Sequence, residues 1–191
     1  MKSKDADRAG SQSSGPETEE HPQPTKGAQG GRPAANSLQL KRILVPTDFS
    51  ECSLQALDYA LGLANEFGAK ITLLHIVEPA FVPDSYLGSL PTMDEVNQNV
   101  LEGGRERLEA LNRKRIGHRV PAETLVRMGR AHSEIPDTAK ALGIDLIVMG
   151  THGASGLQHI LLGSTAERVI RHAPCPVMTV RCSAAARGEQ K

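Results

Sequence analysis

The sequence predicts an α/β protein, a single domain built on a five-stranded, parallel, doubly wound sheet. Short apolar runs alternate with amphipathic helical patterns along most of the 191 residues, which is the order expected of strands joined by crossover helices. Several of these runs show no polar alternation, as is typical of strands buried on both faces. Crossovers between parallel strands are nearly always right-handed, so few topologies remain for the sheet.

The first strand is expected at residues 43–45, an uninterrupted Ile-Leu-Val run. A helix is expected next, because apolar residues recur at spacings of three and four until Gly68 stops the pattern. Asp48 and Ser50 are both candidates for the residue that caps this helix. The β-branched and apolar stretch 71–77 then predicts a second strand.

The rest of the chain continues this alternation. Gly103 and Gly104 lie inside the next helical pattern and weaken it, because glycine disfavours helix interiors. Pro136 is expected in the first turn of the following helix, where a missing N–H matters little. The remaining elements, in chain order, are a helix over 93–116, a strand over 123–126, a helix that Ser133 caps, a strand over 146–149, a helix over 164–172 and a strand over 177–180.

The charge balance argues against binding driven by bulk electrostatics. Lys and Arg number 22, Asp and Glu also number 22, and the formal net charge is zero. Neither nucleic acid nor a membrane is therefore expected as a partner. The sequence has no run of 18 apolar residues and no apolar secretory signal, so we expect a cytoplasmic protein. Its 3 cysteines form no CxxC pair and are expected to be free thiols.

Composition divides the chain into one ordered region and two tails. Residues 1–38 are rich in Ser, Gly, Pro, Glu and Gln and bury too little apolar surface to offset their ordering entropy, so they are expected to be disordered. The ordered domain is expected over residues 40–182. Residues 183–191 are expected to form a flexible tail.

Residues 150–165, with the sequence GTHGASGLQHILLGST, carry the strongest functional signal. Ligands of doubly wound sheets bind beyond the carboxyl ends of the strands, and this stretch begins where the fourth predicted strand ends. Its glycines allow backbone N–H groups to approach an anion closely. Gly163 and Ser164 then open a helix, whose unpaired N–H groups and dipole favour a phosphate. The pattern suits a triphosphate.

Structural interpretations of the same residues stay open at this point. Ser164 with Glu167 fits a capping box, and the glycines alone would also suit tight turns. Asp48 also resembles a helix cap, whereas its functional interpretation is contact with a ribose hydroxyl or Mg²⁺. His152 and Arg168 are expected to face water. Neither GxxxxGK[ST] nor a GxGxxG after the first strand occurs, which argues against a P-loop and against an NAD-binding domain.

Over residues 40–181 the chain resembles the universal stress protein family. The strongest element is the pattern G-x2-G-x9-G-[ST], which Gly150, Gly153, Gly163 and Ser164 match. Supporting segments are ILVPTDFS at 43–50, LLHIVEP at 73–79, DLIVMGTHG at 145–153 and APCPVMTVR, which ends at Arg181. The N-terminal tail is not part of the family pattern.

The resemblance implies an adenine nucleotide α-hydrolase-like, Rossmann-like fold that binds ATP, with Mg²⁺ as its companion ion. Adenine would lie near Pro46, Thr47 and Val77, with Asp48 near the ribose or metal and Gly129 beside the sugar. The phosphates would be held by Gly150, Gly153, Gly163, Ser164 and Thr165. No catalytic residue and no protein metal ligand is assigned.

The resemblance also implies how the protein would act. Members commonly form homodimers through the last strand, here residues 176–181, and a protein partner of unknown identity is expected besides. The implied function is a nucleotide-responsive regulatory module in stress adaptation. Two alternatives remain, a slow ATPase that uses hydrolysis as a timer and a nucleotide-free protein-interaction domain.

Overall fold

The computed structural model describes residues 39–79, 93–152 and 162–182. Internal contacts divide the chain into two units, Met1–Ser37 and Leu38–Lys191, and every described residue belongs to the second. The expectations for the two tails, 1–38 and 183–191, lie outside the described residues, as does the predicted site residue Gly153.

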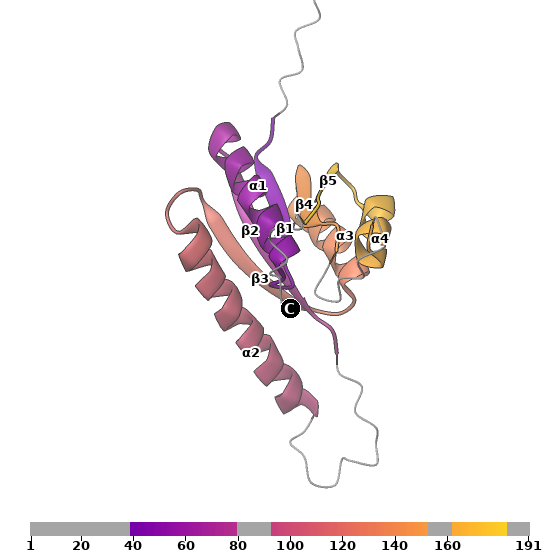
Figure 1. The fold of residues 1–191 in the computed structure, drawn as a ribbon. Coiled ribbons are helices and arrows are strands. Elements are labelled where there is room, and N and C mark those ends of the chain that lie inside the picture. Colours follow the sequence, from indigo (N-terminus) through magenta and orange to yellow (C-terminus); the bar gives the residue numbers. More distant parts are fainter. Residues whose placement is uncertain (1–38, 80–92, 153–161, 183–191) are drawn as a thin grey trace, which may run out of the picture. The chain divides into compact units, whose positions relative to one another are not determined.

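The fold is built on one sheet whose strands all run parallel, in the order β3-β2-β1-β4-β5 (Figure 1). The prediction of a five-stranded parallel sheet is therefore confirmed. β1 lies at the centre of the sheet, with β2 and β3 on one side of it and β4 and β5 on the other. The strand order therefore reverses between β1 and β4. The strands are β1 (Arg42–Pro46), β2 (Lys70–Val77), β3 (Ala122–Met128), β4 (Leu146–Gly150) and β5 (Val177–Val180).

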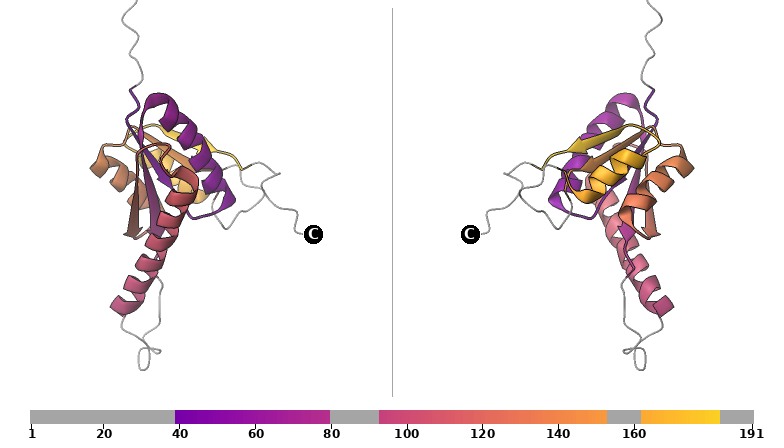
Figure 2. Two further views of the ribbon diagram at one scale, coloured as in Figure 1. Left: turned by 90° about the vertical axis from the view of Figure 1, so that its left-hand side faces the viewer. Right: turned by 90° about the vertical axis from the view of Figure 1, so that its right-hand side faces the viewer.

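Helices cover both faces of the sheet, as Figure 2 shows from two sides. The α1 and α2 helices lie on one face, and α3 and α4 lie on the other. Alternation along β1 explains this division, because Ile43 and Val45 pack with α1 whereas Leu44 packs with α3 and α4. The helices are α1 (Glu51–Phe67), α2 (Met93–Leu111), α3 (Ala131–Leu142) and α4 (Ser164–His172), and a π-helical turn, Asn112–Ile116, extends α2.

The start of α3 differs from the prediction. Ser133 does not cap the helix, which begins at Ala131 with Arg130 as a cap that makes no side-chain hydrogen bond. The N–H groups of Ser133 and Glu134 both donate to the Arg130 carbonyl, so helical bonding starts earlier than a serine cap requires. Pro136 consequently lies beyond the first turn, inside the helix. The tertiary fold here overrides a local capping preference.

The glycine pair of α2 did not prevent a helix, and one member has a packing role. A Cβ at Gly103 would meet nothing within 4 Å, but a Cβ at Gly104 would lie 3.1 Å from Cδ2 of His75. Gly104 therefore lets α2 approach β2 closely. The cost of glycine in a helix interior is offset here by close helix–sheet packing.

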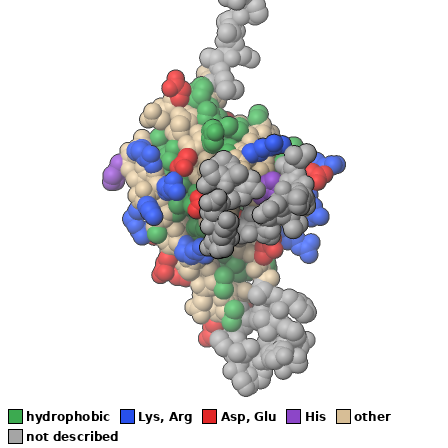
Figure 3. All heavy atoms as spheres, in the orientation of Figure 1, with side chains coloured by type: hydrophobic (Ala, Val, Ile, Leu, Met, Phe, Trp, Pro, Cys, Tyr) green, Lys and Arg blue, Asp and Glu red, His purple; other side chains and the backbone are tan. Residues whose placement is uncertain are grey.

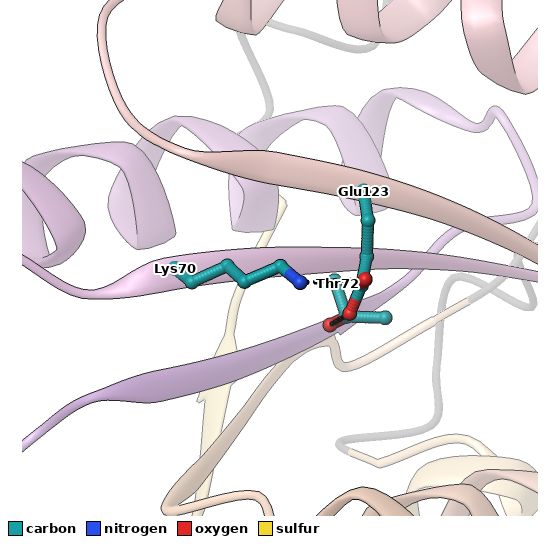
Figure 4. A network of polar contacts seen from close by, with 3 residues as sticks. All are labelled: Lys70, Thr72 and Glu123. Carbon is teal, nitrogen blue, oxygen red and sulfur yellow. Dashed lines mark hydrogen bonds and ion pairs between the residues drawn. The ribbon is translucent and has the colours of Figure 1, made fainter.

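A polar network lies at the amino-terminal end of β2 and β3 (Figure 4). The Lys70 ammonium lies 2.6 Å from Oε2 of Glu123, and the buried Thr72 hydroxyl donates to Oε1 at 2.8 Å. The hydrogen bond from Lys70 is the main cause that lowers the pKa of Glu123; partial burial opposes the shift and the Thr72 bond supports it. The pair lies at the opposite end of the strands from the predicted ligand edge.

This pair makes a specific pH dependence of stability testable. Because the pKa of Glu123 is lowered on folding, its contribution is present above the unfolded-state pKa and lost as pH falls through the folded-state pKa. Glu123→Gln should cost about 0.2–1 kcal/mol at pH 7, since both side chains are nearly half exposed, at 44% and 45%. Urea unfolding from pH 7 to pH 3 should show that the free energies of unfolding of the wild type and the variant converge in acid. An equal difference at both ends of that range would contradict the assignment.

The exposed ion pairs elsewhere offer a control for that experiment. Glu102 and Arg105, on α2, lie 3.0 Å apart and are 59% and 60% exposed. Glu102→Gln should change the free energy of unfolding by less than about 0.5 kcal/mol.

On the face drawn in Figure 3, acidic and basic side chains lie interspersed, in keeping with the balanced charge of the sequence.

No helix among the described residues is long and apolar enough to cross a membrane.

Candidate functional site

A cavity of about 420 Å³ lies at the carboxyl ends of β1 and β4, where the strand order reverses. This is the edge at which doubly wound sheets bind ligands. Its volume falls within the range of about 300–1,000 Å³ common for small-molecule sites. The lining residues are Pro46, Thr47, Asp48, Ser53, Ile76, Ala131, Ile135, Met149, Gly150, Thr151, His152, Gly163, Ser164, Thr165 and Ala166.

The cavity brings together most of the residues that the sequence singled out. Val77 and Gly129 are not among the lining residues, and Gly153 is not described. The Gly129 N–H instead donates to the Val77 carbonyl at 3.0 Å, which joins the ends of β2 and β3. The predicted residues that do line the cavity are Pro46, Thr47, Asp48, Gly150, Gly163, Ser164 and Thr165.

The loop after β1 forms one wall of the cavity. Ser50 is the N-cap of α1, and its Oγ accepts the Ser53 N–H at 3.3 Å, so the interpretation of Asp48 as the cap is wrong. The Asp48 carboxylate instead accepts hydrogen bonds from the N–H and hydroxyl of Ser50. Asp48 therefore supports the cap from outside the helix and lines the cavity at the same time.

The start of α4 forms another part of the cavity lining. Gly163 is the N-cap, with extended backbone angles and no side-chain cap bond, so the interpretation of Ser164 as the capping residue is wrong. The Glu167 N–H donates to the Gly163 carbonyl at 3.0 Å, where the first helical hydrogen bond forms. The cap residue, a glycine, offers no side chain to this end of α4, and the first residues of the helix line the cavity. An anion in the cavity would meet the positive end of the helix dipole.

Two glycines are favoured by close approach rather than by backbone angle. The Gly163 N–H donates to the Thr151 carbonyl at 2.8 Å, and a Cβ on Gly163 would lie 3.0 Å from that oxygen. Its φ of −68° is open to any residue, so the short contact alone favours glycine. At Gly150 a Cβ would lie 3.1 Å from backbone atoms of Cys52 in α1. These contacts join β4 to the start of α4 and to the start of α1.

The described lining carries one carboxylate and no Lys or Arg. That carboxylate belongs to Asp48. His152 lines the cavity with its Nδ1 2.9 Å from the Thr151 hydroxyl, whereas Arg168 is exposed on α4 and does not line it. A polyanion here would be stabilised by N–H groups, hydroxyls and an accompanying cation. No group of three or more His, Cys, Asp or Glu able to hold a metal occurs among the described residues.

Three large apolar residues of the lining were not among the predicted site residues. Ile76, Ile135 and Met149 come from β2, α3 and β4, which lie far apart in the sequence. Ile135 and Met149 are buried, at 2% and 6% exposure, so they also serve the core. Strand alternation could have indicated Met149, which directly precedes Gly150, but no local pattern marks the three as neighbours. Such an apolar surface suits the faces of a planar base.

Comparisons with known proteins agree on one family. The profile of the Universal stress protein family matches residues 39–181. Universal stress protein MJ0531 of Methanocaldococcus jannaschii is 37% identical over 141 residues, which cover 74% of this chain and 82% of that protein. The solved structure of universal stress protein UspA from Lactobacillus plantarum matches with a TM-score of 0.64 and 28% identity, over 75% of this chain and 99% of its own.

A further solved structure supports the fold alone. A universal stress protein solved in complex with cAMP matches with a TM-score of 0.51 and 23% identity, over 76% of this chain and 99% of its own. The same α/β architecture thus recurs in a protein that was crystallised with an adenine nucleotide.

Proposed function

This chain belongs to the universal stress protein family, and we propose that it binds ATP in the cavity at the carboxyl ends of β1 and β4. In this proposal the protein is a nucleotide-responsive regulatory module in stress adaptation. ATP occupancy stabilises the domain and biases its contacts with partners. The module acts in the cytoplasm.

The observation that carries the proposal is that the start of α4 lies at the cavity wall. Gly163, Ser164 and Thr165 line the cavity, and the cap residue Gly163 has no side chain to bond this helix end. Phosphate oxygens supply the acceptors and negative charge that such an end favours. We therefore propose that the phosphates lie against the first turn of α4, with Gly150 and the undescribed Gly153 beside them.

The apolar part of the lining suits the nucleoside. The surface of Ile76, Ile135 and Met149 offers contact for the adenine faces, and Pro46 and Thr47 also line the cavity. Asp48 is a carboxylate in the same lining, able to accept from a ribose hydroxyl or to bind Mg²⁺. Val77 and Gly129 stay predictions for the adenine and sugar ends.

Mg²⁺ fits the chemistry of the lining. Asp48 and the Ser and Thr hydroxyls offer the oxygen ligands that this ion prefers, and it usually binds through one or two carboxylates plus substrate phosphates. When bound, the ion neutralises phosphate charge, since the described lining has no Lys or Arg that could do so. Its binding would therefore depend on the nucleotide.

The partner proposed for the module is a second copy of the chain. Among the described strands β5 lies at one edge of the sheet, and an edge strand presents backbone groups that can pair with another strand. Its residues Val177 to Thr179 are only partly buried. Pairing of two β5 strands would cover the β5 edge of each copy and create a symmetric dimer.

Binding is tested by calorimetry and thermal unfolding with Mg²⁺ and ATP. At a ligand concentration of 100 times Kd, ATP should stabilise the native state by about 2.7 kcal/mol. This corresponds to a rise in Tm of about 5–10 °C for a domain of this size. Inorganic triphosphate and adenosine serve as controls, and each should bind more weakly than ATP. No heat and no shift in Tm at millimolar ATP would refute the proposal; ADP formed in the same samples would reveal the slow hydrolysis named as an alternative.

A further inference from the structure

Phe49 has a backbone conformation that its residue type disfavours. Its φ is 64°, and it is the only non-glycine with a positive φ among the residues that the structure describes. The left-handed region is crowded for any residue with a Cβ, and glycine or asparagine is more usual there. Such a conformation persists only where the surroundings hold it, so the contacts of Phe49 are of interest.

Two side chains from other elements hold the Phe49 ring. The ring centroid lies 4.6 Å from that of His75 in β2, with the planes inclined at 51°. The Arg107 guanidinium of α2 lies over the ring, with Cζ 4.1 Å from the centroid, which is a cation–π contact. Gly104, one helical turn before Arg107, is the glycine that allows α2 to approach His75.

The stack formed by Arg107, Phe49 and His75 is also bonded to residues of the cavity wall. Nδ1 of His75 lies 2.9 Å from the Thr47 carbonyl, and the Phe49 N–H donates to the Thr47 hydroxyl at 3.0 Å. Thr47 and Asp48 line the cavity, whereas Phe49, His75 and Arg107 do not. The left-handed turn at Phe49 separates Asp48 from Ser50, whose groups donate to the Asp48 carboxylate. The stack, which lies outside the cavity lining, therefore holds the loop after β1 in place.

We propose that Phe49 is a positioning residue for nucleotide binding, and that the Arg107–Phe49–His75 stack couples α2 to occupancy of the cavity. The inference rests on the proposed ATP site. When the ring is clamped between β2 and α2, Thr47 and Asp48 are already arranged for the ligand, which avoids an ordering cost on binding. By reciprocity, a ligand that holds Thr47 and Asp48 also favours the clamped position of α2.

The test compares ATP affinity and stability in variants of the full chain. Phe49→Gly removes the ring while accepting the positive φ, and should weaken ATP binding about tenfold, equivalent to about 1.4 kcal/mol. Phe49→Tyr keeps the ring and should restore the wild-type Kd. Arg107→Met removes only the cation from an exposed position and should weaken binding about threefold. Arg105→Met, two residues away and paired with Glu102, is the matched control and should bind as wild type.

Two readouts separate positioning from a purely structural role. Asp48→Ala should weaken binding several-fold in the wild-type background but less than about twofold alongside Phe49→Gly, because Asp48 is then no longer positioned. ATP should slow amide exchange over residues 104–111 in the wild type and not in Arg107→Met. Urea unfolding checks that each variant remains folded.

Each outcome decides a separate claim. If the wild type binds ATP and both Phe49→Gly and Arg107→Met bind equally well, the inference is wrong while the proposed function stands. An equal cost of Asp48→Ala in both backgrounds likewise overturns positioning. If the wild type binds no ATP, the proposed function fails and the inference fails with it. Arg107→Met keeps the test decisive even if Phe49→Gly does not fold.

Discussion

Replacing Gly163 with valine should abolish ATP binding, with Kd raised at least about 100-fold, or about 2.7 kcal/mol. The Cβ would lie 3.0 Å from the Thr151 carbonyl, which the Gly163 N–H now contacts at 2.8 Å. Relief requires that α4 move away from the end of β4, and this displaces the N–H groups proposed to bind phosphate. Hydrogen bonds to charged groups are worth about 1.5–3 kcal/mol each, so loss of one or two accounts for the effect. Calorimetry with Mg²⁺ and ATP measures it.

Gly103→Val is the control for this change. A Cβ at Gly103 in α2 would meet nothing within 4 Å, and valine is a slightly better helix former than glycine. Its ATP affinity and its free energy of unfolding should stay close to those of the wild type. Wild-type affinity in Gly163→Val would show that the phosphates do not lie against the start of α4.

Gly150→Ala should lower both stability and ATP affinity. Its Cβ would lie 3.1 Å from the backbone carbon and oxygen of Cys52, so the first turn of α1 must shift. Inserting a group into such a packed contact costs about 1–3 kcal/mol of unfolding free energy. The same turn carries Ser53, a lining residue, and the cap Ser50 that supports Asp48. Urea unfolding and calorimetry on one preparation measure the two effects.

A variant at Gly68 is the control that separates a loss of stability from a loss of ATP binding. Gly68 ends α1 with a φ of 65°, and a Cβ there would meet nothing within 4 Å. Gly68→Ala should cost about 1–2 kcal/mol through backbone strain while leaving ATP affinity unchanged. If the two variants lose stability equally and neither loses affinity, Gly150 has no role at the site.

Much of the fold could be predicted because its signals are local. Apolar runs without alternation identified the strands, and the predicted bounds of α4 and β5 agree with the structure. Errors fell where several residues compete for one role. Asp48 and Ser50 both suit an N-cap, and the tertiary path of the chain selects Ser50. At α3 the local preference favours Ser133, but the tertiary path begins the helix after Arg130. Local preference cannot decide between candidates of similar strength.

For the site, the sequence determined which residue types lie at the carboxyl edge of the sheet, because strand order and the glycine pattern place them there. Only the tertiary structure decided how they meet: Gly163 against Thr151, and Phe49 between His75 and Arg107. Residues 49, 75 and 107 belong to three elements, and no periodicity relates them. Local backbone preference acts over a few residues, whereas contacts of this kind arise only when separate elements pack to their final distances.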